Sequence, residues 1–399
     1  MKLLLLIFLL LPALCAAQIR TGADRLVAER LDLVRGKRVG LVTNQTGRLS
    51  TGTYLVDTLR TLGVAVTALF GPEHGIRGVA GPGETVNDSV DERTGIPVFS
   101  LYGAVSEPSP AMLRRVDVLV YDIQDVGARF YTYISTMALC MDAAARAGIP
   151  FIVLDRPNPL GGLLVDGPVL EDSLKSFVGL LPVPVVYGLT IGELARMTNG
   201  EGWLPSGKHA DLTVVPVAGW QRAMTWRDTD LPWIAPSPNI PSPEAALAYP
   251  ATCFIEATNL SEGRGTVAPF QLFGAPFVDA SRLATALAEL HLPGVAWGPA
   301  EFVPEASKQQ GKTCYGVRMD VTAFSAYRPL TVAAWILRTL SLQCGDRLQV
   351  RAPALTRLAG THDVGQAMCG RLSIDAVVSR WAQKTKEFER RSAPYRLYQ

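Results

Sequence analysis

Polar side chains gather directly after several apolar segments of this sequence, and their types suit hydrolytic chemistry. Four apolar runs end in this way, at residues 38–43, 64–70, 116–121 and 150–154. The polar residues that follow them are Asn44, then Glu73 and His74, then Asp122 and Asp125, and then Asp155, Arg156 and Asn158. In open parallel sheets, ligands bind outside the carboxyl ends of the strands, so four such ends predict one shared crevice.

Carboxylates are the groups in this predicted crevice that are best suited to catalysis. Glycoside hydrolysis needs an acid that protonates the leaving oxygen and a second group that handles water or oxocarbenium-like charge. Glu73 stands between a proline and His74-Gly75, in a turn that should hold it firmly, and is the candidate general acid. The alternative for Glu73 is a solvated loop glutamate.

The aspartates of the crevice have two interpretations each. Asp122 and Asp125 lie three residues apart, so one is expected to face the crevice while the other ties down a backbone turn. The neighbours Asp155 and Arg156 form either a structural ion pair or a substrate clamp. These interpretations stay open at the level of the sequence.

A second polar stretch, EATNLSEGRGT at residues 256–266, places polar groups beside glycines. Glycines let a backbone approach a ligand closely, and the guanidinium of Arg264 has the fork geometry that binds a carboxylate. The alternative is a surface turn stabilised by a Glu–Arg pair.

Several other chemistries lack their motifs. No G-x-G-x-x-G follows the first strand, and neither a phosphate-binding loop nor a G-x-S-x-G nucleophile turn occurs. The sequence has no C-x-x-C and no H-x-x-x-H spacing, so we predict no cofactor and no histidine- or cysteine-bound metal. Carboxylate-bound Mg²⁺ or Ca²⁺ stays open.

The elements that must position these residues alternate between strands and helices. Helical patterns at 54–62 and 131–147 separate the apolar runs, which predicts a parallel sheet covered on both faces, in a Rossmann-like α/β domain. Thr190 and Glu193 form a capping box that opens another helix. We predict that the Pro- and Trp-rich segment 220–250 is an irregular connection. Further helices are predicted at 279–290, 331–342 and 373–391, the last of them amphipathic.

The two ends of this pattern suggest two domains behind an export signal. Met1-Lys2, an apolar run and the small residues Ala16-Ala17 predict a signal peptide at residues 1–17, with a retained anchor as the alternative. We expect a Rossmann-like catalytic domain at 18–245 and a smaller mixed α+β auxiliary domain at 246–399 that closes the cleft. The expected product is a secreted, periplasmic protein without a stable membrane span.

Charge and cysteines limit the partners. Residues 1–17 hold one lysine and no acid, so their removal lowers the formal charge from +2 to +1, which gives no electrostatic footprint for nucleic acid. Export permits disulfides, and up to two are expected among the four C-terminal cysteines. Cys140 is expected to be a buried small residue. The oligomeric state is open.

The sequence resembles the exo-β-N-acetylmuramidase family, peptidoglycan exo-hexosaminidases long grouped as a domain of unknown function. The resemblance covers most of residues 38–277 and is looser after about 280. The matching blocks are GLVTNQTG (40–47), LFGPEHGIRG (69–78), TGIPVFSLYG (94–103), VDVLVYDIQDVGARFYTYISTM (116–137), VLDRPNPLGG (153–162), GLTIGELA (188–195), PSPNIPS (236–242), TNLSEGRGT (258–266) and PFQLFGAPF (269–277).

The resemblance implies an active site in a cleft between two domains and release of N-acetylmuramic acid from the non-reducing end of MurNAc-GlcNAc fragments during wall turnover. It makes Glu73 the leading catalytic acid, with Asp122 and Asp125 as catalytic partners. The lactyl carboxylate of muramic acid requires a cation, for which Arg264 and Arg129 are the candidates. The expected substrate ligands are Asn44, His74, Arg129, Asp155, Arg156, Asn158, Tyr187, Asn259, Glu262 and Arg264.

One departure from the family pattern supports a competing hypothesis. Relatives tend to carry Arg-His where this sequence has Val186-Tyr187, so Tyr187 would have to replace that histidine. A non-catalytic peptidoglycan-binding protein is therefore the first alternative, although Glu73, Asp122, Asp125 and Glu262 are all present. The second alternative is an amidase or esterase acting on wall peptides. The sequence has no recognisable nucleophile motif or zinc ligand set for such an enzyme.

Overall fold

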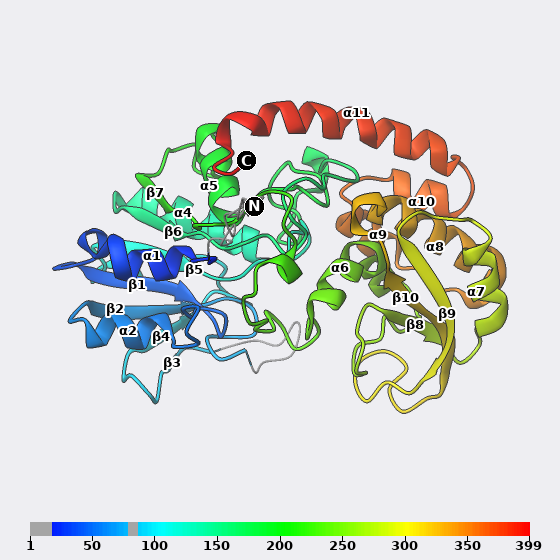
Figure 1. Cartoon of the computed structure of the whole chain (residues 1–399), viewed down its shortest axis with the longest axis horizontal. Coiled ribbons are helices and arrows are strands. Elements are labelled where there is room, and N and C mark those ends of the chain that lie inside the picture. Colours follow the sequence, from blue (N-terminus) through cyan, green and yellow to red (C-terminus); the bar gives the residue numbers. More distant parts are fainter. Residues whose placement is uncertain (1–17, 79–86) are drawn as a thin grey trace, which may run out of the picture.

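The computed structural model of the chain describes residues 18–78 and 87–399, so the predicted signal peptide lies outside the described residues. Two parts lie side by side (Figure 1). The first, at the left of Figure 1, contains a seven-stranded sheet, and the second, at the right, contains a three-stranded sheet with several helices.

The seven-stranded sheet has the order β3-β4-β2-β1-β5-β6-β7. The β3–β4 pair is antiparallel and the other neighbouring pairs are parallel. The predicted parallel sheet is therefore confirmed, with β3, β4 and β7 as short additions at its edges. The strands are β1 (Arg38–Thr43), β2 (Ala65–Gly71), β3 (Ser89–Val90), β4 (Pro97–Ser100), β5 (Val118–Asp122), β6 (Phe151–Leu154) and β7 (Leu212–Val215).

Helices cover both faces of this sheet because alternate strand residues are apolar on both sides. Val118 and Val120 pack with α1 (Gly22–Glu29) and α2 (Leu55–Thr61). Leu119 and Tyr121 face the opposite way, into the main core. The helices on that side are α3 (Pro110–Leu113), α4 (Tyr133–Ala147) and α5 (Ile191–Gly200). Gly148 ends α4 in the left-handed conformation, and Thr190 and Glu193 form the predicted capping box of α5.

The second part is built on the antiparallel sheet β8-β10-β9, and the main hydrophobic core continues into it. The helices predicted near 279–290, 331–342 and 373–391 are present. The elements are α6 (Pro243–Thr252), β8 (Leu272–Ala275), α7 (Ala280–Ala288), β9 (Val295–Phe302), β10 (Cys314–Val321), α8 (Pro329–Cys344), α9 (Ala352–Ala359), α10 (Asp363–Met368) and α11 (Ile374–Ser392).

The prediction that segment 220–250 is irregular was wrong for residues 243–250, which are helical. Helix α6 begins at Pro243, and Ser242 caps it by accepting a hydrogen bond from the amide of Ala245. Proline suits the first turn of a helix, where its missing N–H would have no helical acceptor. Pro250 lies inside the helix near its C-terminal end, and buried alanines on both sides stabilise the helix by packing.

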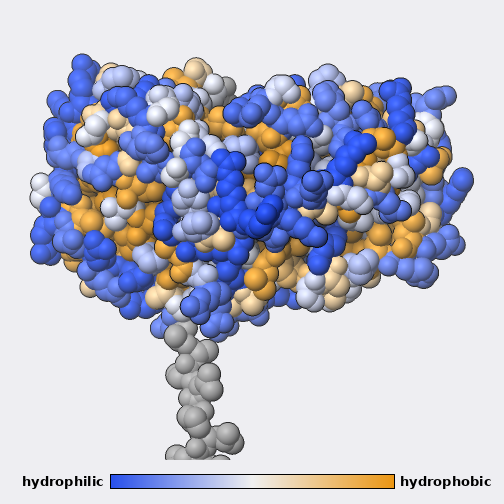
Figure 2. All heavy atoms as spheres, turned by 90° about the horizontal axis from the view of Figure 1, so that it is seen from above, coloured by the Kyte–Doolittle hydropathy of each residue, from blue (hydrophilic) through white to orange (hydrophobic). Residues whose placement is uncertain are grey.

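Helix α11 bridges the two parts and brings the end of the chain back to the first one (Figure 1). Arg391 forms an ion pair with Glu201, and the ring of Tyr398 packs edge-on against Trp220 with centroids 5.0 Å apart. Figure 2 shows hydrophilic residues across the middle of this face of the molecule, where α11 runs. Within residues 18–78 and 87–399, no helix is both long and apolar enough to cross a membrane.

The expected disulfides are absent among the described cysteines, all of which are free thiols. Cys253 and Cys344 lie in the main core, whereas Cys314 packs in a separate small cluster with Phe302. Cys369 is exposed. These thiols act as small apolar residues in separate places, and Cys140 is buried as predicted.

Candidate active site

A cleft of about 390 Å³ lies where the two parts meet. From the first part, Glu73 and His74 line it, together with the loop residue Tyr102. From the second part, Glu262 and Arg264 line it. The structure thus brings together four of the residues predicted from the sequence, from segments nearly two hundred positions apart.

Glu73 is placed by a tight turn at the carboxyl end of β2. The turn closes through a 2.9 Å hydrogen bond from the amide of Gly75 to the carbonyl oxygen of Pro72. His74 has φ 74° and Gly75 has φ 71°, both in the left-handed region. This backbone conformation is uncommon for a residue with a side chain, and strained residues of this kind cluster at functional sites. The turn fixes where Glu73 enters the cleft.

Two hydroxyl groups hold the carboxyl group of Glu73. Thr132 donates a 2.9 Å hydrogen bond to it from the N-cap position of α4, so the carboxyl group also lies near the positive end of a helix dipole. Tyr102 hydrogen-bonds to the same carboxyl group, and burial together with the charge of Glu73 raises the pKa of Tyr102 to about 12. Tyr102 therefore stays protonated at neutral pH and donates to Glu73.

Aromatic rings form the apolar lining of the cleft. Tyr249 packs edge-on against Phe270 with centroids 4.7 Å apart and against Phe130 at 5.0 Å. Tyr131 packs edge-on against Tyr249 at 5.9 Å. These rings are buried against one another and form the apolar base of the cleft. An apolar surface with a few fixed polar groups is the usual composition of a small-molecule site.

The opposite side of the cleft is a cluster of charges, called here the charged wall, which consists of Glu256, Glu262, Arg264, Lys308 and Arg351. The guanidinium of Arg264 lies 2.5 Å from Glu256 and 3.0 Å from Glu262. Lys308 lies 2.9 Å from Glu262. Burial lowers the pKa of Arg264, but the charges of Glu256 and Glu262 outweigh it and raise that pKa overall. Arg264 is thus both the predicted ion-paired residue and a residue of the cleft.

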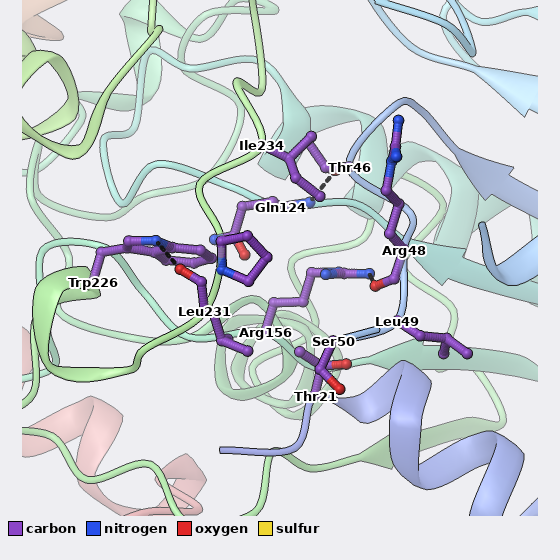
Figure 3. Close-up of a pocket in the computed structure, with 11 residues that line it drawn as sticks. Thr21, Thr46, Arg48, Leu49, Ser50, Gln124, Arg156, Trp226, Leu231 and Ile234 are labelled. Carbon is purple, nitrogen blue, oxygen red and sulfur yellow. Dashed lines mark hydrogen bonds between the residues drawn. The ribbon is translucent and has the colours of Figure 1, made fainter. Parts of the chain in front are cut away.

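The remaining predicted residues lie outside this cleft. Asp122 is fully buried and forms a 2.7 Å ion pair with Arg156, so Arg156 pairs with Asp122 rather than with its neighbour Asp155. Burial raises the pKa of Asp122 against the opposing effect of Arg156. Arg156 also donates to the carbonyl oxygen of Arg48 at 2.9 Å, as Figure 3 shows.

The crevice expected beyond the carboxyl ends of β1, β5 and β6 is largely filled by the chain itself. Thr46, Gln124 and Arg156 surround a cavity of only about 20 Å³, and Trp226 and Leu231 cover it (Figure 3). Such a volume holds about one water molecule. This cavity is too small for a sugar ring, and the larger cleft lies at the end of β2 instead.

Asp125 and Tyr187 form a second buried pair outside the cleft. The Asp125 carboxylate accepts a hydrogen bond from the Tyr187 hydroxyl and another from the amide of Gly127 at 2.7 Å, which is the predicted backbone turn. Burial raises the pKa of Asp125 to about 6, although these hydrogen bonds oppose the shift. Tyr187 is 1% exposed and does not line the cleft, so it makes no direct substitute for a sugar ligand.

Asp155 joins three segments of the first part. Its carboxylate accepts hydrogen bonds from Thr190 at 2.7 Å, from the amide of Gly192 at 2.8 Å and from the hydroxyl of Tyr398. Burial raises the pKa of Asp155 to about 7. Asp155 therefore anchors the start of α5 and the end of the chain.

Arg129 holds the two parts together. Its guanidinium donates to the carbonyl oxygens of Pro168 and Val183 in the first part and to those of Leu358 and Ala359 in the second, at 2.6–3.2 Å. Burial lowers the pKa of Arg129 to about 9. Because Arg129 is fully buried and committed to these carbonyl oxygens, Arg264 is the better placed of the two arginines considered for the substrate carboxylate.

The three predicted asparagines also make contacts within the chain. Asn44 accepts from the amide and hydroxyl of Thr46, and Asn158 donates to the carbonyl oxygen of Leu189. Asn259 connects to the backbone of residues 347 and 349. Their polar side chains organise the loops that surround the cleft.

The fold also brings into the cleft residues that no sequence pattern distinguishes. Glu256 lies in the polar stretch 256–266 and Thr132 in the block 116–137, but neither residue differs from its neighbours by a motif. The aromatic residues Tyr102 and Tyr249 and the cations Lys308 and Arg351 had no local signal, because their neighbours in sequence face other surroundings. Within residues 18–78 and 87–399, no group of three or more His, Cys, Asp or Glu side chains is placed to hold a metal ion.

Comparisons with known proteins agree with this architecture. Residues 39–244 match the family described as "Exo-beta-N-acetylmuramidase NamZ, N-terminal", and residues 247–398 match its C-terminal counterpart. A Bacillus subtilis (strain 168) protein named peptidoglycan beta-N-acetylmuramidase NamZ is 44% identical over 383 residues, which is 96% of this chain and 92% of the relative.

Two crystal structures of DUF1343 family proteins from Bacteroides fragilis NCTC 9343 are similar to this one. The first has a TM-score of 0.89 at 38% identity, and the second has 0.79 at 35%. Each comparison covers 96% of this chain and 99% of the other. The seven-stranded and three-stranded sheets are therefore arranged here as in proteins of known structure.

Proposed function

This chain belongs to the exo-β-N-acetylmuramidase family, and we propose that it removes N-acetylmuramic acid from the non-reducing end of peptidoglycan fragments with Glu73 as its catalytic acid. It is a glycosidase, and its substrates are glycans derived from peptidoglycan. The observation that supports Glu73 most directly is its place in the cleft, where Thr132 and Tyr102 hold its carboxyl group beside an aromatic lining.

In the proposed reaction, Glu73 donates its proton to the glycosidic oxygen as the bond to the anomeric carbon breaks. The Tyr102 and Thr132 hydroxyls fix the direction of that proton transfer. Without an oriented acid the leaving group would depart as an alkoxide, which is why a positioned carboxylic acid accelerates the step by roughly 10²- to 10⁴-fold.

The second catalytic function is assigned to the 2-acetamido group of the substrate. Among the described residues that line the cleft, the other carboxylates are Glu256 and Glu262, and both form ion pairs with Arg264. An ion-paired carboxylate is a weakened nucleophile, whereas the acetamido oxygen is carried to the anomeric carbon by the substrate itself. This route retains the β-configuration in the first product released.

The decisive experiment compares a chromogenic β-MurNAc glycoside with its β-GlcNAc twin, using the purified protein and Glu73→Gln. We expect wild-type turnover of the muramic glycoside and, on MurNAc-GlcNAc, whose leaving sugar oxygen needs protonation, a loss of about 10³-fold in kcat for the variant. Asp172→Asn serves as a carboxyl-to-amide control, because Asp172 is 83% exposed and lies outside the cleft. NMR of the first-formed sugar should show the β-anomer, and an α-anomer would exclude participation of the acetamido group.

A non-catalytic binding protein would behave differently in the same assay. It would bind MurNAc but turn over neither glycoside, and Glu73→Gln would leave its affinity intact. The hypothesis of a non-catalytic protein is based on Tyr187, which stands where relatives tend to have histidine. Tyr187 is buried and does not line the cleft, so this replacement gives no direct reason for a loss of activity.

We further propose that the protein is exported to the periplasm. The basic start, apolar run and small residues within 1–17 support this location, because peptidoglycan fragments arise outside the cytoplasm. N-terminal sequencing of the protein recovered from the periplasmic fraction should begin at Gln18. Recovery only from the cytoplasm, with Met1 intact, would refute the proposal.

A further inference from the structure

The charged wall contains three cations and two carboxylates, so it has one positive charge in excess. A ligand carboxylate needs a cation whose charge is not neutralised and whose N–H donors are not already used within the chain. Arg264, Lys308 and Arg351 differ in both properties.

Lys308 has no donor left. Its ammonium group has three N–H bonds, and it lies 2.9 Å from Glu262, 2.7 Å from the carbonyl oxygen of Ile255 and 3.0 Å from that of Thr258. Any ligand oxygen would have to displace one of these partners. Lys308 therefore stabilises the charged wall and has no donor with which to bind the substrate.

Arg264 is neutralised by its neighbours. It contacts Glu256 and Glu262, as described above, and its guanidinium also lies 5.0 Å from the ring centroid of Phe270. Its side chain is only 16% exposed. A substrate carboxylate approaching Arg264 would meet two fixed carboxylates at the same site, which disfavours binding by like-charge repulsion.

Arg351 is the remaining cation. Its backbone amide donates to the carbonyl oxygen of Ala257 at 2.8 Å, and its Nη2 donates to the carbonyl oxygen of Glu256 at 2.7 Å. Arg351 is exposed and lines the cleft. Within residues 18–78 and 87–399, no carboxylate forms an ion pair with Arg351. Most of its five N–H donors are thus available for a planar carboxylate.

We propose that Arg351 is the residue that selects muramic acid by binding its lactyl carboxylate, while Arg264 and Lys308 hold the wall that positions it. This inference rests on the proposed function, since it assumes that the MurNAc ring occupies the cleft beside Glu73. It replaces the choice between Arg264 and Arg129 with a third arginine that has no carboxylate partner of its own.

The test measures kcat/KM for the β-MurNAc glycoside, for the same glycoside with its lactyl group converted to the neutral amide, and for the β-GlcNAc twin. The variants are Arg351→Gln, Arg351→Lys and the control Arg357→Gln, an exposed arginine on α9 that does not line the cleft. Thermal unfolding of each variant is followed in parallel.

For Arg351→Gln we expect kcat/KM on the acid substrate to fall by about 30-fold or more, chiefly through KM, because a charge-assisted pair is lost. The values for the amide and for the β-GlcNAc glycoside should stay close to wild type. Arg351→Lys keeps the charge without the fork and should lie in between. Arg357→Gln should match wild type on every substrate.

Loss of discrimination between acid and amide would support the proposal, and unchanged discrimination in Arg351→Gln would overturn it. If Arg351→Gln fails to fold, Arg351→Lys must still lower the ratio of kcat/KM for the acid glycoside to kcat/KM for the amide. If wild type hydrolyses no glycoside, the proposed function fails, but calorimetry with MurNAc and its lactyl amide still tests carboxylate recognition by Arg351.

Discussion

Two groups of polar residues in this protein both combine carboxylates with arginines, but they differ in their access to solvent. One group lies after β1, β5 and β6, where Asp122, Asp125 and Asp155 are 0–6% exposed and hydrogen-bond to Arg156, Tyr187 and Tyr398. The other lies in the cleft, where Glu73 and the charged wall border a space of about 390 Å³. In the first group the chain encloses the carboxylates, whereas in the second the two parts leave an open space beside them.

A carboxylate at a strand end is therefore not in itself evidence of catalysis. In the buried group, tertiary contacts fill the crevice and convert the polar residues into connections between loops. In the cleft, the two parts meet without filling the space, so donors and acceptors stay available to a ligand. We therefore expect the first group to control stability and the second to control activity.

The largest expected effect on stability comes from Arg156→Ala. The change leaves Asp122 buried without its partner, which should lower the free energy of unfolding by about 3–5 kcal/mol. Urea unfolding measures the loss, and Arg38→Ala is the control, because its ion pair with Asp117 is 49% and 41% exposed and contributes little to stability. Equal effects of the two changes would show that the buried ion pair between Arg156 and Asp122 contributes no more to stability than an exposed one.

A smaller effect is expected from Tyr187→Phe, which removes the hydroxyl donor of Asp125 and keeps the ring. The free energy of unfolding should fall by about 1–3 kcal/mol, because a buried acceptor loses its partner. The kcat/KM on the β-MurNAc glycoside should change less than threefold, since Tyr187 does not line the cleft. A large loss of activity at unchanged stability would move Tyr187 into the site.

A third prediction concerns the pH dependence of stability. Folding raises the pKa of Asp155 from 3.8 to about 7, so its contribution is fully present below about pH 4 and is lost as pH rises through about 7. Asp155→Asn should therefore gain stability relative to wild type between pH 5 and pH 8.

Asp117→Asn is the control for this experiment. Its pKa in the folded protein is lowered to about 2, mainly by its hydrogen bond with Arg38, so its contribution is lost only below about pH 4. Its difference from wild type should be flat between pH 5 and pH 8. A flat difference for Asp155→Asn as well would mean that Asp155 is ionised in the folded protein throughout this range.

The sequence alone was sufficient for the elements and for the position of the candidate acid. Strand β1 begins and ends where the apolar run RVGLVT does, and α4 ends at Gly148 as expected, because burial period, capping and glycine act over a few residues. The turn at Pro72–Gly75 is likewise local, so the place of Glu73 at the end of β2 follows from its immediate neighbours in the chain.

Only the tertiary structure decided which polar residues face a ligand. Whether Asp125 is buried by Tyr187, or Asp155 by Tyr398, depends on segments 62 and 243 positions away, and no local pattern records those distances. The same holds for Arg351, which enters the cleft because α9 packs beside residues 253–257. Side-chain chemistry is local, but access to solvent and to substrate depends on how distant segments pack.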